Sequence, residues 1–163
     1  MKLLRPKPCN DSKCRTKHLP GERVALAIDL CNARGVKLTL IRRQVLELLW
    51  EIGHPCSAYK LIDALKPKVS RLVGPPTVYR ALDFLIKQGL VAKIESKSVF
   101  FPCIHPERET DFLIFICSNC GSMEELENPN VENLLAEQAT ALGFNAAKRT
   151  IEVEGECRLC ISK

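Results

Sequence analysis

Two pairs of cysteines in the last third of the chain have the spacing of metal ligands. Cys117 and Cys120 form one C-x-x-C pair, and Cys157 and Cys160 form a second. Four thiolates from two tight turns complete a tetrahedral zinc shell, and such a site contributes folding energy directly. Gly121 allows the first turn to direct backbone amides at the sulfurs. The alternative is that the pairs form two redox dithiols or two disulfides. Because the chain shows no export signal, two such pairs favour structural zinc over disulfides.

The other cysteines are weaker ligand candidates. Cys31 and Cys56 fit helix faces or loop packing, where a thiol acts as a small apolar side chain. Cys9, Cys14 and His18 have loose ligand spacing, and incidental thiols in a flexible arm are the simpler interpretation.

A histidine and a glutamate before the first cysteine pair also suggest a catalytic zinc site. His105-Pro-Glu107 precedes the first C-x-x-C pair, which formally resembles the signature of zinc deaminases. Two features depart from that signature and disfavour this interpretation. Only nine residues separate Glu107 from Cys117, and Ile116 rather than proline precedes that cysteine. The sequence offers no candidate catalytic residues, so we predict that the protein is not an enzyme.

The charge distribution predicts a polyanionic partner. Residues 1–100 carry 19 Lys and Arg against 8 Asp and Glu, a net +11, whereas residues 101–163 carry 5 against 11, a net −6. A basic part followed by an acidic part indicates two modules, the first a candidate for binding nucleic acid.

Helical periodicity in the first part positions the basic residues. Apolar spacing predicts a helix over residues 22–34, a second from a cap at Thr39 to Gly53, and a third from a cap at Ser57 to Leu65. A fourth helix is predicted from the end of the turn at 74–76 to about residue 88. Alternation over 90–95 and 99–102 predicts a hairpin around 96–98. Helices followed by a hairpin make a winged helix-turn-helix; a plain helical domain with a hairpin is the alternative.

The fourth predicted helix carries the candidate DNA contacts. Its side opposite the apolar stripe presents Thr77, Tyr79, Arg80 and Lys87, and Tyr59 lies near the start of the third helix. Arg80 can donate two hydrogen bonds to a guanine or bind a phosphate. Thr77 lies at the positive end of the helix dipole, which favours a phosphate there. We therefore predict binding to double-stranded DNA.

The second part reads as a small α+β module. Strands are expected at 112–116, 123–126 and 147–153, with a helix over 131–142 ended by Gly143. About sixty residues form only a small hydrophobic core, so we expect a metal or a partner subunit to stabilise this module.

Membrane and secretory classes are disfavoured. The longest apolar run spans six residues, 112–117, which is too short to cross a bilayer. Met1–Asn10 contains two prolines and no apolar segment, so we expect no signal peptide and a cytoplasmic protein.

Together these motifs resemble a known family. The stretches 56–63, 75–85 and 88–90 look like a ferric-uptake-regulator-type repressor, and with 115–121 and 151–160 they are most similar to the zinc uptake regulator branch. The resemblance implies an α+β protein and a homodimer that represses zinc-uptake genes from a palindromic operator. It assigns Cys117, Cys120, Cys157 and Cys160 to structural zinc, and Tyr59 and Arg80 to DNA reading.

The implied domains are a flexible N-terminal arm over 1–20, a winged helix-turn-helix domain over 21–102, and a small zinc-stapled α/β dimerisation domain over 103–163.

The sensing site departs from the family pattern. Cys103 and Glu125 match two expected ligands, but Ala92 and Thr110 or Asp111 stand where histidines are expected. We predict a rebuilt regulatory zinc site from Cys103, His105, Asp111 and Glu125. The alternatives are a lost sensor, a regulator of another metal or of peroxide, and, in a different class, a cytosolic zinc or thiol-redox carrier.

Overall fold

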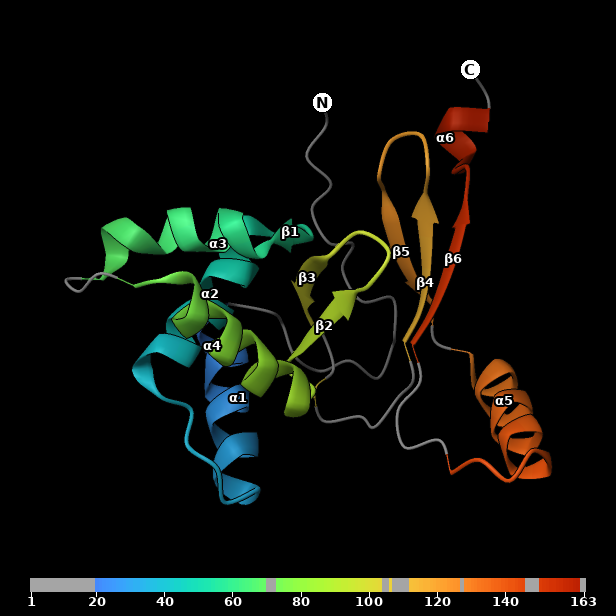
Figure 1. The fold of residues 1–163 in the computed structure, drawn as a ribbon, viewed down its shortest axis with the longest axis horizontal. Helices are drawn as coiled ribbons and strands as arrows, with labels where there is room; N and C mark the ends of the chain where they lie inside the picture. The colour runs from blue at the N-terminus through green and yellow to red at the C-terminus, as the bar shows by residue number, and fades with distance from the viewer. Residues whose placement is uncertain are drawn as a thin grey trace. The chain divides into compact units, whose positions relative to one another are not determined.

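The computed structural model describes residues 20–69, 73–103, 106, 112–126, 128–145 and 150–161 (Figure 1). The chain divides into two compact units, Met1–Arg108 and Glu109–Lys163, which are described separately below.

Four helices form most of the first unit. They are α1 (Pro20–Ala33), α2 (Leu40–Ile52), α3 (Ala58–Leu65) and α4 (Pro75–Lys87), with a short 3-10 turn, η1 (Lys66–Lys68), after α3. Gly53 ends α2 in the left-handed conformation at φ 66°, and the Ser57 hydroxyl caps α3 by accepting from the amide of Lys60. The helices and these two end signals confirm the predicted pattern. Thr39 does precede α2, but its side chain makes no capping hydrogen bond.

Apolar stripes of the helices meet in one core. Fully buried members from α2, α3 and α4 are Val45, Leu46, Leu49, Leu61, Leu65, Val78, Leu82 and Leu85. At the edge of this core, two arginines from other parts of the first unit contact the C-terminal end of α4. The Arg42 guanidinium stacks 3.6 Å from the centre of the Phe84 ring, and Arg34 donates a 2.5 Å hydrogen bond to the Gln88 carbonyl. The position of α4 is thus fixed by packing and by polar contacts at its end.

A three-stranded sheet completes the first unit. Strands β2 (Val91–Ile94) and β3 (Val99–Pro102) form the predicted hairpin, and β1 (Cys56–Ser57) adds to the free edge of β3. Cys56 therefore lies on a strand, not on the helix face or loop we predicted, because pairing across more than forty residues leaves no local periodicity. The Cys103 amide donates to the Leu90 carbonyl at 3.0 Å, so Cys103 extends the hairpin of the first unit although we expected it to begin the second module.

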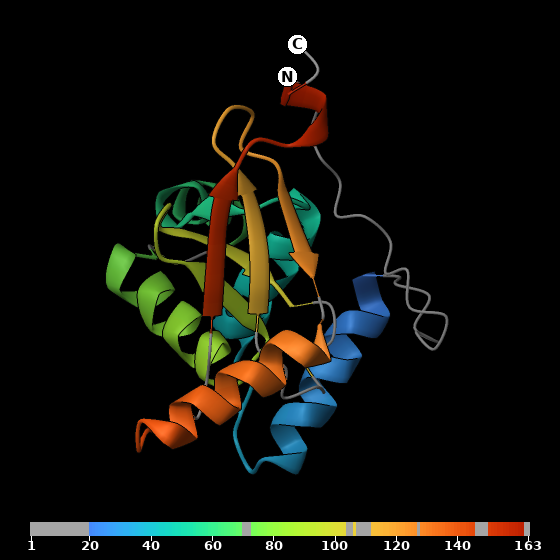
Figure 2. The same ribbon diagram turned by 90° about the vertical axis from the view of Figure 1, so that its right-hand side faces the viewer.

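The second unit contains a sheet and two helices. The strands are β4 (Phe112–Cys117), β5 (Met123–Leu126) and β6 (Thr150–Gly155), and the helices are α5 (Pro129–Ala141) and α6 (Arg158–Ile161). Central β4 pairs antiparallel with β5 and parallel with β6. Figure 2 shows the strands side by side, with α6 beyond one end of β6 and α5 near the opposite end of the sheet. The short α6 was not predicted, since one helical turn has no detectable periodicity.

Among the described residues, no helix combines the length and the apolar character needed to cross a membrane.

The α4 core contact predicts a specific stability loss. Leu82 is fully buried, so Leu82→Ala should lower the free energy of unfolding by about 2–5 kcal/mol through lost burial and a residual cavity. Leu40→Ala is the control, because Leu40 is 71% exposed and its loss should change stability by less than about 0.5 kcal/mol. Urea unfolding followed by circular dichroism measures both, and equal effects would contradict the assigned core.

Candidate metal centre and nucleic-acid interface

The parallel pairing of β4 with β6 brings the two C-x-x-C pairs together. Cys117 is the last residue of β4 and lies opposite Gly155 at the end of β6, two residues before Cys157. The Ser118 amide and hydroxyl both donate to the Gly155 carbonyl, at 2.8 and 3.1 Å. Because parallel strands end at the same edge of a sheet, the turns after them share that edge. The pairs therefore meet although Cys157 follows Cys120 by 37 positions in the sequence.

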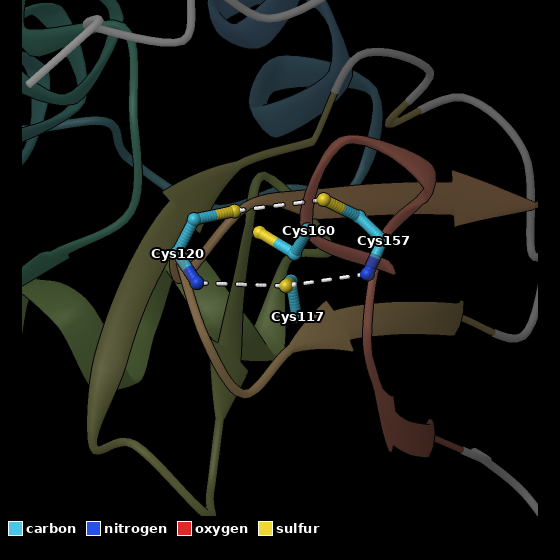
Figure 3. Close-up of side chains that lie close together, drawn as sticks. All are labelled: Cys117, Cys120, Cys157 and Cys160. Carbon is cyan, nitrogen blue, oxygen red and sulfur yellow. Dashed lines mark hydrogen bonds between the residues drawn. The ribbon is translucent and has the colours of Figure 1, made fainter. Parts of the chain in front are cut away.

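The four sulfurs form a compact set with tetrahedral dimensions. The Sγ atoms of Cys117, Cys120, Cys157 and Cys160 all lie within 4.8 Å of one another (Figure 3). The Sγ atoms of Cys120 and Cys157 are 3.7 Å apart, and zinc–sulfur bonds of about 2.3 Å at tetrahedral angles would separate sulfurs by about 3.8 Å. All four are free cysteines, so neither pair forms a disulfide.

Backbone amides favour the thiolate form of one member. The amides of Cys120 and Cys157 donate to Cys117 Sγ at 3.5 and 3.3 Å, and with Asn119 they lower the pKa of Cys117 to about 6. Gly121 makes this turn possible in the left-handed conformation at φ 70°. The predicted role of Gly121 is thereby confirmed.

Neighbouring groups shift the pKa values of Cys120 and Cys160 in opposite directions. The Ser122 hydroxyl, 3.2 Å from Cys120 Sγ, lowers the pKa of Cys120, whereas hydrogen bonding to Cys157 raises the pKa of Cys160 to about 12. Crowded thiols cannot all ionise without a cation to balance their charge. A soft, all-sulfur tetrahedral set is the donor chemistry that zinc takes in structural sites, so these residues fit the metal. Ser122 was not among the predicted site residues. Its position two residues after Cys120 is the sequence feature that could have indicated this contact.

The remaining described cysteines belong to the first unit and are buried. Burial raises the pKa of Cys31, and it raises the pKa of Cys56 to about 11, so both thiols stay protonated and unreactive. Both pack in the hydrophobic core, which confirms the prediction of small apolar core residues. Cys9, Cys14 and His18 lie outside the described residues.

The structure places one side chain of the predicted regulatory set. Cys103 is buried at the end of the hairpin. His105 and Asp111 lie outside the described residues, as does the side chain of Glu125, whose backbone lies opposite Ile114 in the β4–β5 register.

The predicted DNA contacts lie on the solvent side of α3 and α4. Helix α4 buries Val78, Ala81, Leu82 and Leu85 and leaves its three predicted contacts exposed. Tyr59, in the first turn of α3, is 71% exposed, and Tyr79 on α4 is 41% exposed. Arg80 and Thr77 are also exposed. Large aromatic side chains that point into water on two neighbouring helices are typical of a binding surface.

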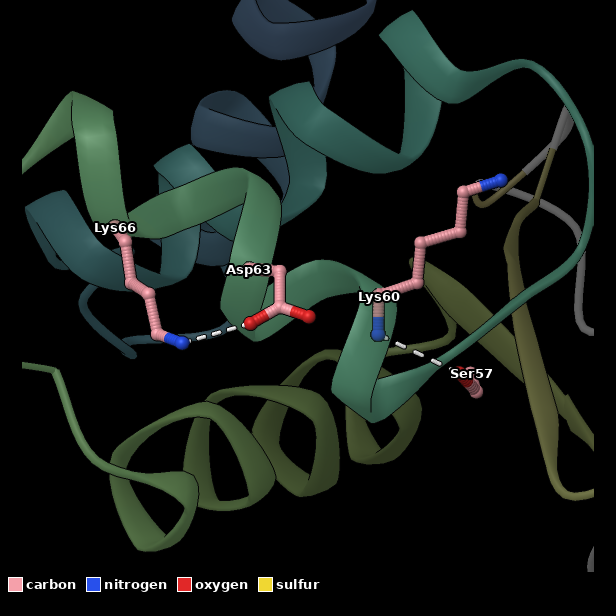
Figure 4. Close-up of polar contacts among 4 residues, drawn as sticks. All are labelled: Ser57, Lys60, Asp63 and Lys66. Atoms are coloured by element: carbon pink, nitrogen blue, oxygen red, sulfur yellow. Dashed lines mark hydrogen bonds and ion pairs between the residues drawn. The ribbon is translucent and has the colours of Figure 1, made fainter.

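The first turn of α4 offers few backbone donors. Pro75 and Pro76 have no amide hydrogen, and the Thr77 amide donates to the Gly74 carbonyl at 3.0 Å. A phosphate at this end would therefore contact the Thr77 hydroxyl, not a row of free amides. The exposed surface of α3 adds the basic group of Lys60, whereas Lys66, just after α3, pairs with Asp63 at 2.7 Å (Figure 4).

Comparison with known proteins identifies the family. Residues 33–154 match the Ferric uptake regulator family, about three quarters of the chain. The chain belongs to the ferric uptake regulator family. It is 38% identical to the zinc uptake regulation protein of Escherichia coli K12 over 86% of this chain and 82% of that protein. It is 34% identical to that of Mycobacterium tuberculosis H37Rv over 80% of this chain and 99% of the relative.

A solved structure supports the same placement. A zinc uptake regulator complexed with zinc and DNA superimposes with a TM-score of 0.80 at 37% identity, covering 90% of this chain and 97% of that one. The predicted resemblance to the zinc uptake regulator branch and the predicted α+β fold class are confirmed.

The four-sulfur geometry predicts that metal and folding are coupled in the second unit. Cys117→Ser should abolish tight zinc binding and unfold this unit, because three ligands on a thin core no longer hold the strand ends together. Metal analysis and near-UV circular dichroism measure this. Cys31→Ala is the matched control, a buried cysteine outside the set, and it should retain zinc. Full zinc content in Cys117→Ser would refute the assigned centre.

Proposed function

We propose that the protein is a zinc-responsive transcriptional repressor of zinc-uptake genes that binds a palindromic operator as a homodimer. The observation that carries this proposal is the winged-helix unit whose α4 presents Tyr79 and Arg80 to solvent, in a chain similar to a DNA-bound zinc uptake regulator. Members of the family regulate transcription, and we expect no enzymatic activity. An operator-binding protein acts where the chromosome is, so we propose a cytoplasmic location.

DNA reading is assigned to the exposed side of two helices. Arg80 is placed to bind a base edge in the major groove, with Tyr79 and Thr77 beside it on α4 and Tyr59 on α3. Two such helices in a symmetric dimer read two half-sites about one helical turn, or a multiple, apart, which accounts for a palindromic operator.

Exposed apolar surface in the second unit supports dimerisation. Phe115 and Val153 are neighbours across the β4–β6 pair, and Phe115 is 45% exposed. Helix α5 has no buried residue, and its Leu134 is 56% exposed. A large apolar surface on so small a unit is typical of an interface, and a second copy is the partner that operator symmetry requires.

Structural zinc is assigned to Cys117, Cys120, Cys157 and Cys160. When bound, it joins the ends of β4 and β6 and balances the charge of four thiolates. We further propose a regulatory zinc held by Cys103, His105, Asp111 and Glu125. Its binding would raise the population of the conformation that is competent for DNA and thereby raise operator affinity.

The assignment of Arg80 predicts a loss of sequence discrimination. A duplex library selected with the zinc-loaded protein supplies the operator, and failure to enrich any inverted repeat would contradict the proposed function. Against that operator, Arg80→Ala should cost about 1–3 kcal/mol and relax preference at one base in each half-site. Lys87→Ala, at the C-terminal end of the same helix, is the control and should leave base preference unchanged. An even loss across all sequences for Arg80→Ala would identify it as a phosphate contact.

The regulatory site predicts two separable effects of zinc. Fluorescence anisotropy of the operator across a free-zinc series should show affinity falling before the structural zinc is lost, because a second site with weaker affinity empties first. Cys103→Ser should shift this dependence to higher free zinc while four-cysteine zinc content stays unchanged. Operator binding that never weakens until structural zinc is removed would show that the sensor is lost.

A further inference from the structure

The loop before α3 holds a histidine in hydrogen-bond contact with a lysine of that helix. His54 Nε2 lies 3.3 Å from Lys60 Nζ, and His54 Nδ1 lies 3.0 Å from the Pro55 carbonyl oxygen. A lysine ammonium has only hydrogen to donate, so Nε2 must be the acceptor. Nδ1 then carries the proton and donates to the carbonyl. The contact therefore selects a neutral imidazole in one tautomer.

Lys60 contacts the imidazole and no carboxylate among the described residues. Asp63, one turn further along α3, is bound by Lys66 at 2.7 Å. Figure 4 shows Lys60 extending away from Asp63, toward the opposite end of the helix. A lysine bound to a carboxylate is neutralised, whereas one bound to a neutral imidazole is held in place and remains a cation. Two of its three donor hydrogens stay available to another acceptor.

The location of Lys60 matches that of a phosphate-binding residue. It is exposed and directly follows Tyr59 in the first turn of α3, on the surface to which DNA contact is assigned. Ordering a free lysine side chain costs conformational entropy, and a preformed contact removes part of that cost before the ligand arrives.

We propose that His54 is a positioning residue that holds Lys60 for contact with a DNA backbone phosphate. This inference rests on the proposed function, since it assumes that α3 faces DNA. The contact is independent of base sequence, so it adds affinity for the operator and for any other duplex alike.

A double-mutant cycle tests the proposal in the zinc-loaded full chain. The probes are the selected inverted-repeat duplex and a random-sequence duplex of equal length, each titrated at several salt concentrations. Lys60→Ala should weaken binding to both probes by a similar factor and reduce the salt slope by about one. His54→Ala should give a smaller loss on both probes, and that loss should disappear in the Lys60→Ala background. His54→Gln, which keeps an acceptor near Nε2, should recover most of it.

Lys66→Ala is the matched control, in the short 3-10 turn that directly follows α3. Its ammonium contacts Asp63 and not His54, so the loss from His54→Ala should persist in full in this background. Zinc content and far-UV circular dichroism establish that every variant is folded. An equal loss from His54→Ala with and without Lys60, or no loss at all, would overturn the positioning role.

A measurement without DNA separates the two proposals. Nitrogen NMR shifts of the imidazole should report the Nδ1-protonated tautomer of His54 in the wild-type protein and a tautomer mixture in Lys60→Ala. Absence of duplex binding by the wild-type protein would refute the proposed function, regardless of the tautomer that His54 adopts. Normal duplex binding with an additive cycle, or without a tautomer preference, would leave that function standing and reject the inference.

Discussion

Charge balance among four neighbouring sulfurs is the constraint on which the second unit depends. Among its described residues, the buried apolar set comprises only Ile114, Ile116 and Cys117, a core too small to hold a sheet and two helices by burial alone. The ends of β4 and β6 instead converge on four thiols within 4.8 Å of one another. Without a cation, amides and neighbouring sulfurs push the pKa values of Cys117 and Cys160 in opposite directions. A bound zinc ion balances the negative charge of all four thiolates, and its binding energy also stabilises the fold of the second unit.

The first unit is stabilised in a different way and needs no metal for its core. Helices α2, α3 and α4 share one continuous apolar cluster, and Arg34 and Arg42 fix the end of α4 through a carbonyl and an aromatic ring. This rigidity is useful because DNA reading requires side chains at fixed positions. The polar side of the same helices is then free to carry Tyr59, Tyr79 and Arg80 without cost to packing.

Two hydrogen bonds connect the end of the hairpin to α4. The Cys103 amide donates to the Leu90 carbonyl at 3.0 Å, and the Leu90 amide donates to the Leu85 carbonyl at 2.9 Å within the last turns of α4. A ligand bound at Cys103 would therefore act on a residue joined through backbone to α4. Of the proposed sensor ligands, Cys103 thus lies in the same unit as the proposed DNA contacts.

The sequence by itself determined the helices, the hairpin, the cysteine pairs and the exposed side of α4, because each depends on local spacing or on a short motif. Tertiary structure alone decided the pairing of β1 with β3, the place of Cys103 in the first unit and the turn α6, since these depend on contacts between distant residues or on a single turn. It also revealed the contact of Lys60 with His54, which lies in the loop between α2 and β1. Spacing shows which side chains can meet, but only the folded backbone decides which of them do.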